Sequence, residues 1–382
     1  MKIPRALIDR VLTLTAIIFT MCGWSAGAQT LNLPSEWMEN QKIARPLYKA
    51  DTLTICIMGD IMMHTAQIEN AAVKDGDYTF NTYFSLIQDR LEEADLTIAN
   101  MEFTLGGPPY TGYPSFSAPD QFAEYVAESG INVFLMANNH IFDKGSKGAA
   151  RTLEQYDRLA LTHGIRYCGI AKDAEQKDII HPLQVRMKGM KISLINFTYG
   201  TNTGGSEAWP KVNYMNDKTS LLEALRKAEG SDLTLVLPHW GNEYELTHSS
   251  GQEDMARWLI ENGADAIIGA HPHVVQDSEF IEDIPVVYSL GNAVSNMSAP
   301  NTQLGMIATI KMVRETDGDV RMLHPELTWT WCSRPGGFCN SYIIIPVEEY
   351  LDRPEEWKNR NDYTKMVATY KRVKEIFRNR TI

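Results

Sequence analysis

Two of the nine histidines in this 382-residue chain stand two residues apart in the stretch IIGAHPHVVQ, residues 267–276. Successive side chains of an extended backbone point to opposite faces, so the pattern predicts that His271 and His273 share a face. Two imidazoles at the end of a buried strand can hold a metal ion. A polar exit from the strand is the alternative, and the short motif alone leaves both interpretations open.

Further polar side chains of the same chemistry also follow apolar runs. Each lies at or just past the C-terminal end of a predicted strand, the edge at which open α/β sheets bind ligands. With the histidine pair, the set comprises Asp60, Glu102, Asn139, His140, His239, His271 and His273. Taken singly, each has a structural alternative, such as a helix cap, a turn or a hydrogen-bonded histidine. Their concentration at one predicted edge favours a shared site.

Carboxylate, amide and imidazole groups are ligands that divalent Mn, Zn and Fe accept. No cysteine falls among these positions, so a thiolate-rich structural zinc site is not indicated. We therefore expect one or two divalent ions, with Glu102 as a carboxylate able to bridge a pair. Two ions would activate water and neutralise charge on a phosphate or carbonyl oxygen.

The elements that would position these side chains alternate between short apolar runs and amphipathic stretches. Strands are expected at 53–60, 95–102, 131–140, 232–241, 264–273, 284–292 and 304–312, and helices at 83–94, 120–130, 148–164, 217–229, 251–263 and 362–378. Residues 181–199 predict a hairpin that turns at Lys188-Gly189. This alternation is typical of an α/β fold with a mainly parallel sheet.

Residues 1–28 have the features of an export signal, with a basic start, an apolar run and a cleavage site at Ala26-Gly27-Ala28. The apolar run is too short to span a membrane comfortably, and no second run of membrane length follows. We therefore expect a periplasmic or extracellular protein with no transmembrane segment after cleavage. Residues 29–51 are expected to form an irregular lead-in.

Charge and cysteines narrow the possible partners and bonds. The formal net charge is −12, so a nucleic-acid partner is not expected, because affinity for a polyanion comes mainly from Lys and Arg. Cys332 and Cys339 bracket the turn-rich stretch SRPGGF and could pair in an oxidising compartment, although geometry decides that. Cys56 and Cys168 lie in apolar segments of the sequence and are expected to be buried thiols.

Six short motifs in order carry a family resemblance. They are MGDIMMH (58–64), ANMEFTL (99–105), ANNHIFDKG (137–145), PHWGNEYELTHSSGQ (238–252), GAHPHVVQ (269–276) and YSLGNAV (288–294). Together they resemble the CapA-type poly-γ-glutamate (capsule) biosynthesis proteins, a family similar to the calcineurin-like metallophosphoesterases. The resemblance covers about residues 52–295. It implies a layered metallophosphoesterase-like β-sandwich flanked by helices at 52–331, with 332–382 as a C-terminal extension of loop, strand and helix.

The resemblance also implies a role for each matching residue. The expected metal ligands are Asp60, Glu102 in the place of a bridging aspartate, Asn139, His239, His271 and His273. His140 matches the histidine that contacts substrate or donates a proton, and Asp143 could orient it.

One position departs from the phosphoesterase pattern. The first motif there is Asp-x-His, whereas this chain has Asp60-Ile61-Met62. His64 comes two residues late and faces the same way only if the strand continues, so one ion could be weakly held or absent. We expect His64, Trp240 and Glu243 to contact substrate, with packing as the alternative role of Trp240.

Two functions stay open. The first is an exported metal-dependent enzyme that acts on an anionic envelope polymer or its precursor, by hydrolysis or transfer at an amide or phosphoester. The resemblance implies poly-γ-glutamate capsule biosynthesis, with other capsule-assembly proteins as further expected partners. The second is a non-catalytic polymer-binding or assembly module that keeps the fold. The missing Asp-x-His histidine favours the second, and the otherwise complete ligand set favours the first.

Overall fold

The computed structural model describes residues 50–204, 208–378 and 380–382, which belong to one compact unit, residues 48–382. The expected export signal and all but the last two residues of the expected lead-in lie outside the described residues. No helix in the described part of the chain is both long enough and apolar enough to cross a membrane.

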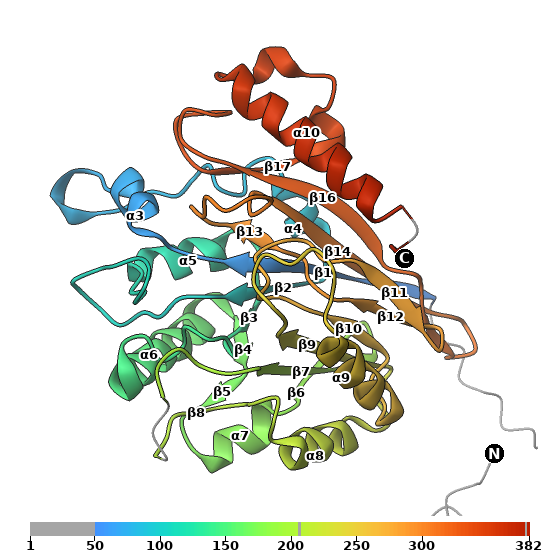
Figure 1. Cartoon of the computed structure of the whole chain (residues 1–382). Coiled ribbons are helices and arrows are strands. Elements are labelled where there is room, and N and C mark those ends of the chain that lie inside the picture. Colours follow the sequence, from blue (N-terminus) through green and yellow to red (C-terminus); the bar gives the residue numbers. More distant parts are fainter. Residues whose placement is uncertain (1–49, 205–207, 379) are drawn as a thin grey trace, which may run out of the picture. The chain divides into compact units, whose positions relative to one another are not determined.

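Two β-sheets form the centre of this unit (Figure 1). The strand order of the first is β17 (Ile343–Pro346), β16 (Glu326–Ser333), β14 (Leu304–Arg314), β1 (Asp51–Ile61), β2 (Leu96–Met101), β3 (Val133–Leu135) and β4 (Arg166–Cys168), with β13 (Asn292–Val294) on β1 and β15 (Val320–Met322) on β14. The second runs β11 (Ser278–Ile281), β12 (Ile284–Val287), β10 (Ala266–Ile268), β9 (Leu233–His239), β7 (Met190–Thr198) and β6 (Leu183–Met187). A small third sheet pairs β5 (Ile170–Ala171) with β8 (Lys211–Val212).

Helices flank the two sheets. They are α3 (Thr65–Ala71), α4 (Gln88–Glu93), α5 (Asp120–Glu128), α6 (Gly145–His163), α7 (Ala174–Ile180), α8 (Lys218–Ala228), α9 (Ser250–Glu261) and α10 (Arg360–Ile376), with 3₁₀ turns at Lys74–Gly76, Val347–Tyr350 and Pro354–Glu356. In Figure 1, α10 lies along β16 of the first sheet, and α8 and α9 lie beside the second. The expected layered α/β sandwich with flanking helices is therefore confirmed.

The core is continuous between the sheets. Leu53, Ile55 and Ile57 of β1 and Leu235 of β9 belong to one buried cluster. Strands that are buried on both faces have nearly continuous apolar sequences, so these strands could be predicted from the sequence. A second cluster forms where α8 and α9 pack on the outer face of β9 and β10, and it includes the fully buried Trp240.

Parallel pairing gathers the carboxyl ends of the site-bearing strands. The pairs β1–β2, β2–β3 and β3–β4 are parallel in the first sheet, as are β7–β9, β9–β10 and β10–β12 in the second. The prediction of a mainly parallel sheet is wrong for the other half of the first sheet, where β14, β15, β16 and β17 pair antiparallel. Those strands belong to hairpins near the chain's end, whereas the parallel strands need helical crossovers.

Several predicted elements differ from the structure. The helix expected at 83–94 begins only at Gln88, because residues 81–87 form turns that bury Tyr83, Phe84 and Ile87. The hairpin at 181–199 is confirmed, with Lys188 and Gly189 both at positive φ between β6 and β7. The strand expected at 264–273 ends at Ile268.

The C-terminal residues complete the first sheet. The expected boundary between residues 331 and 332 falls inside β16, and β17 pairs with β16 across it. Cys332 and Cys339 are free thiols, so the structure does not join them. Cys332 is buried and its Sγ lies 3.5 Å from the carbonyl oxygen of Ser295, while Cys339 contacts Ser341.

Candidate metal centre

Asp60 links three segments at the edge of the first sheet. It ends the parallel part of β1, where the register against β2 shifts, and its side chain is fully buried. Its Oδ1 accepts a hydrogen bond from Nδ2 of Asn100 at 2.6 Å, and its Oδ2 accepts from the backbone N–H of His271 at 3.2 Å. A carboxylate held by donors from two other segments is already oriented for a further cationic partner.

Glu102 is the least satisfied polar group of the site. The side chain is fully buried, and neither carboxylate oxygen has a hydrogen-bond partner among the described residues. Its Oε1 lies 3.6 Å from Nε2 of His239, 3.7 Å from Nε2 of His273 and 4.0 Å from Nε2 of His140. A buried carboxylate without donors is costly, and a cation held between it and the imidazoles would remove that cost.

Burial sets the protonation of these groups. Burial raises the pKa of Glu102 well above its usual range, and the negative charges of Asp60 and Glu243 add to the shift. Burial lowers the pKa of His239 well below its usual range, with the neighbouring histidines adding to the effect. For His271, burial and the charge of His273 lower the pKa to about 3. Neutral imidazole is the form that binds a metal ion.

The donor atoms form two overlapping groups. One comprises Glu102, His271 and His273, the other Asp60, Glu102 and His239, and within each group the candidate ligand atoms lie within 4.8 Å of one another. All five residues are buried and Glu102 is common to both groups, the placement that a bridging carboxylate requires. The buried Nδ1 of His271 also has no hydrogen-bond partner within residues 50–204, 208–378 and 380–382. This mixture of imidazole and carboxylate fits a divalent transition-metal ion.

His271 and His273 do not share one face of a strand as predicted, although their rings do lie close together. Both follow the end of β10, with φ of 101° and 58°, so neither belongs to an extended strand. Their ring centroids are 5.8 Å apart because the loop turns back toward the sheet edge. Positive φ is strained for residues with a side chain, and such strain concentrates at functional sites.

Asn139 and His140 follow β3 and reach the same centre. Oδ1 of Asn139 lies 2.7 Å from Nε2 of His239. Nδ1 of His140 lies 2.7 Å from Oδ2 of Asp143, which also accepts the backbone N–H of Phe116 at 2.8 Å. The carboxylate therefore fixes the imidazole on its Nδ1 side and leaves Nε2 directed toward Glu102, the geometry that an orienting role requires.

Sequence reasoning missed Asn100 and Asn202. Nδ2 of Asn100 contacts both Asp60 and, at 3.1 Å, Nδ1 of His239. Nδ2 of Asn202 lies 3.3 and 3.4 Å from the two ring nitrogens of His140, and its backbone N–H donates to the carbonyl of Asn139 at 2.8 Å. Asn202 lies in the loop after β7, beyond the positions at or just past a strand end that the sequence pattern selects.

The three expected substrate contacts have different surroundings. His64 lies beyond the end of β1 as the N-cap of α3, and its ring packs edge-on against Phe116, which packs against His140. Glu243 is exposed, and its charge contributes to the raised pKa of Glu102. Trp240 is fully buried in the second core cluster, where its indole N–H donates to a backbone carbonyl at 2.9 Å. That placement favours packing rather than substrate contact for Trp240.

Residues 54–297 match the model of a family described as "Bacterial capsule synthesis protein PGA_cap". The chain belongs to this capsule synthesis family. The matched range runs from β1 past β13 and contains every residue of the centre, so the family's fold and this site coincide in the chain.

Curated relatives agree with the family. The "Capsule biosynthesis protein CapA" of Bacillus anthracis is 28% identical over 308 residues, covering 77% of this chain and 69% of the relative. The "PGA biosynthesis protein CapA" of Bacillus subtilis is 25% identical over 267 residues, covering 67% of each. Among solved structures, the NAD nucleotidase of Haemophilus influenzae covers 86% of this chain and 61% of its own at 15% identity, with a TM-score of 0.41. That likeness is too loose to bear on function.

Proposed function

We propose that this capsule synthesis family member is an exported metal-dependent enzyme that hydrolyses or transfers an amide or phosphoester bond of an anionic envelope polymer, poly-γ-glutamate or its precursor. Membership of the family and the names of the Bacillus relatives support the polymer. One observation supports the metal dependence: the buried carboxylate of Glu102 has no hydrogen-bond partner among the described residues and lies near the imidazoles of His239 and His273.

The residues that would hold one or two ions are Asp60, Glu102, Asn139, His239, His271 and His273. A bound ion would supply Lewis-acid polarisation of a carbonyl or phosphoryl oxygen and favour a water nucleophile. His140 then moves the proton. Its Nδ1 is held by Asp143, so Nε2 is the atom free to give or take a proton at the substrate.

A non-catalytic polymer-binding module is the second candidate, and Met62 favours it. Met62 is 1% exposed and packs in the core at the position where the phosphoesterase pattern has a histidine. His64 does not replace that histidine on the strand, because β1 ends at Ile61. A centre with one fewer ligand binds metal less tightly, and a scaffold would need no metal.

The test compares His140→Ala with His271→Ala in the purified protein, measuring metal content and turnover on phosphoesters and γ-glutamyl amides. We expect His140→Ala to keep its metal and lose about 10²–10⁴-fold in turnover, the usual contribution of general acid–base catalysis. His271→Ala should lose metal. His163→Ala, at the end of α6, is the control and should change neither. Wild-type turnover in metal-loaded His140→Ala would end the catalytic assignment.

A further inference from the structure

The stretch SRPGGF, bracketed by Cys332 and Cys339, has no role in the metal centre and contains no disulfide. It begins at Ser333, the last residue of β16, and forms the first part of the connection to β17. Gly336 has φ of +85°, and a Cβ at Gly337 would lie 2.2 Å from Oδ2 of Asp362, so both positions require glycine. The turn is thus tightly built, and it carries one arginine.

The guanidinium of Arg334 is poorly satisfied by its surroundings. Its Nε and Nη2 atoms are buried and have no hydrogen-bond partner, and the described residues offer its guanidinium no ion pair. Burying a cationic group without an anion is costly. The planar donor fork of arginine matches a carboxylate, which can accept two parallel hydrogen bonds from it.

A pocket of about 290 Å³ opens beside this guanidinium. Its lining residues are Gln303, Arg334, Pro335, Gly336, Gly337, Asn359 and Asp362. Lys365 of α10 lies against it, with Nζ donating to Oε1 of Gln303 at 2.5 Å. The one acidic lining residue, Asp362, already accepts a hydrogen bond from Oγ of Ser333 at 2.6 Å. The two cations outnumber that single carboxylate, so the pocket favours an anion.

The pocket is connected to the metal centre by direct contacts. Sγ of Cys332, beside the Arg334 turn, contacts the carbonyl of Ser295 at 3.5 Å. The next residue, Asn296, donates its backbone N–H to Nδ1 of His64 at 3.3 Å. His64 in turn packs on Phe116 against His140. These contacts run through the buried Cys332, Ser295 and Phe116, so they join the turn to the packing around His140.

We propose that the Arg334 pocket is a carboxylate subsite that holds a γ-linked glutamyl chain. It rests on the proposed function for the identity of the polymer, but it needs no metal. Charge complementarity favours a γ-linked glutamyl chain as the ligand of this pocket, because each residue of such a chain presents a carboxylate.

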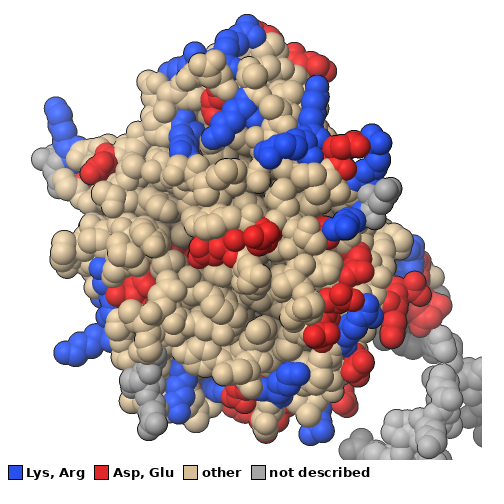
Figure 2. Space-filling model, in the orientation of Figure 1, with Lys and Arg blue, Asp and Glu red and all other residues tan. Residues whose placement is uncertain are grey.

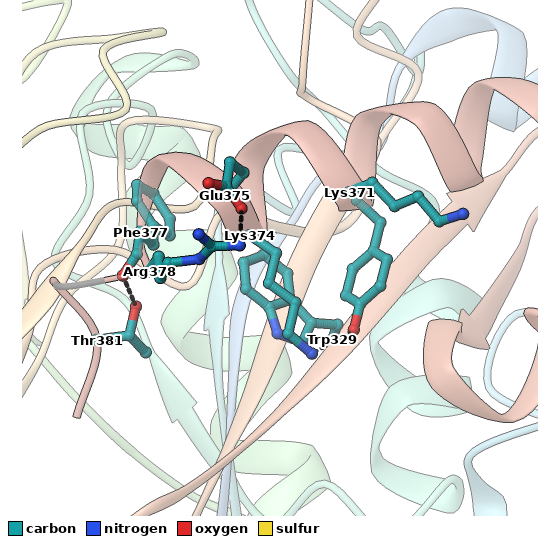
Figure 3. A pocket seen from close by; sticks show the side chains of 8 residues that line it. Trp329, Lys371, Lys374, Glu375, Phe377, Arg378 and Thr381 are labelled. Atoms are coloured by element: carbon teal, nitrogen blue, oxygen red, sulfur yellow. Dashed lines mark hydrogen bonds and ion pairs between the residues drawn. The ribbon is translucent and has the colours of Figure 1, made fainter.

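The larger groove on α10 is a weaker candidate for the polymer-binding site. Figure 3 shows it, about 520 Å³ and lined by Trp329, Tyr370, Lys371, Lys374, Glu375, Phe377, Arg378 and Thr381. Lys and Arg side chains gather over this part of the molecule in Figure 2, while acidic side chains cross the middle of the same face. In the groove, however, Lys374 pairs with Glu348 at 2.8 Å and Arg378 with Glu375 at 2.8 Å. Two of the three cations that line the groove therefore already have carboxylate partners, whereas Arg334 has none among the described residues.

The experiment measures binding of a fluorescent γ-linked octaglutamate to the full chain by anisotropy, with and without a chelator. We expect Arg334→Gln to weaken binding about tenfold or more, as loss of a charge-assisted hydrogen bond does, with metal content and unfolding temperature unchanged. Arg334→Lys should fall between. Asp362→Asn removes the competing carboxylate and should tighten binding. Arg321→Gln, which removes an equal charge from the exposed β15, is the control.

The outcomes separate the two proposals. Octaglutamate binding by Arg334→Gln equal to that of wild type, or no binding by wild type, would overturn the subsite. Equal affinity for free glutamate and the octamer would also overturn it, because a single monomer would then suffice. Should Arg334→Gln fail to fold, unchanged binding by Asp362→Asn overturns it instead. Arg334-dependent binding without turnover under any metal would defeat only the enzyme proposal.

Discussion

Replacing Glu102 by glutamine should have opposite effects on the stability of the metal-free and metal-loaded protein. In the metal-free protein, Glu102 is fully buried, neither of its oxygens accepts a hydrogen bond from the part of the chain that the structure describes, and burial raises its pKa. An unsatisfied buried polar group costs about 1–3 kcal/mol. Glutamine has nearly the same shape, carries no charge, and can donate to Nε2 of His273, which lies 3.7 Å away and accepts because Nδ1 of that ring faces Oδ1 of Asn292. We therefore expect metal-free Glu102→Gln to be more stable than wild type by about that amount.

The same change should remove the stabilisation that metal provides. A ligand at 100 times its Kd stabilises a folded protein by about 2.7 kcal/mol. Glu102 belongs to both groups of candidate ligands, so its loss weakens either arrangement. Mn or Zn added to Glu102→Gln should then raise stability far less than in wild type.

Denaturant unfolding with and without chelator, beside metal analysis, measures both effects. Glu261→Gln removes the same charge from an exposed position on α9 and should stay within about 0.5 kcal/mol of wild type in each condition. Full metal stabilisation in Glu102→Gln would refute the ligand assignment. Lower stability of the metal-free variant would refute the inference that this carboxylate is unsatisfied.

Three further predictions concern other parts of the chain. Asn202→Ala removes the amide contact to His140. Because a neutral hydrogen bond contributes about 0.5–1.5 kcal/mol, turnover should fall about two- to tenfold at unchanged metal content, with a shifted pH–rate profile. An unchanged pH–rate profile would contradict the positioning role of Asn202. His181 is buried, and burial lowers its pKa from 6.5 to about 4, so it contributes stability above pH 6.5 that is lost as the pH falls toward 4. Between pH 7 and 5, the unfolding free energy of His181→Gln should fall by about 2 kcal/mol less than that of wild type. An equal fall of the unfolding free energy with pH in both proteins would contradict the role of His181. Trp240→Ala should lower the unfolding free energy by about 3–5 kcal/mol, because it leaves a cavity in the core. A change near zero would contradict the assignment of Trp240 to the core.

The strand-end pattern in the sequence was sufficient to predict which polar side chains come together at the sheet edge. Parallel strands that are buried on both faces must be apolar along their length, so the first polar residue after each run marks a sheet edge. Asp60, Glu102 and His239 were found in this way, and the structure brings their side chains together. Local patterns also sufficed for the hairpin at Lys188-Gly189, because turn chemistry is short-range.

Other features depended on contacts between distant residues. His271 and His273 approach one another through positive-φ loop conformations that no period-two pattern predicts. Trp240 and His239 are neighbours in the chain, yet one is held in the core and the other at the centre, because successive residues leaving a strand face opposite layers. Helix 83–94 was predicted too long, since burial of Tyr83 and Phe84 against other elements outweighed its helical spacing.

The sequence by itself therefore determined the layered α/β fold, the sheet edge that carries the site and most of its candidate ligands, because these follow from apolar periodicity and residue chemistry. The tertiary structure alone decided which of those groups lack a partner. Glu102 and Arg334 are set apart by their surroundings: Glu102 lies among imidazoles and Arg334 lines a pocket, and both have buried polar atoms without a hydrogen-bond partner among the described residues. Desolvation and hydrogen-bond satisfaction are properties of neighbours in space, and residues far apart in the chain supply those neighbours.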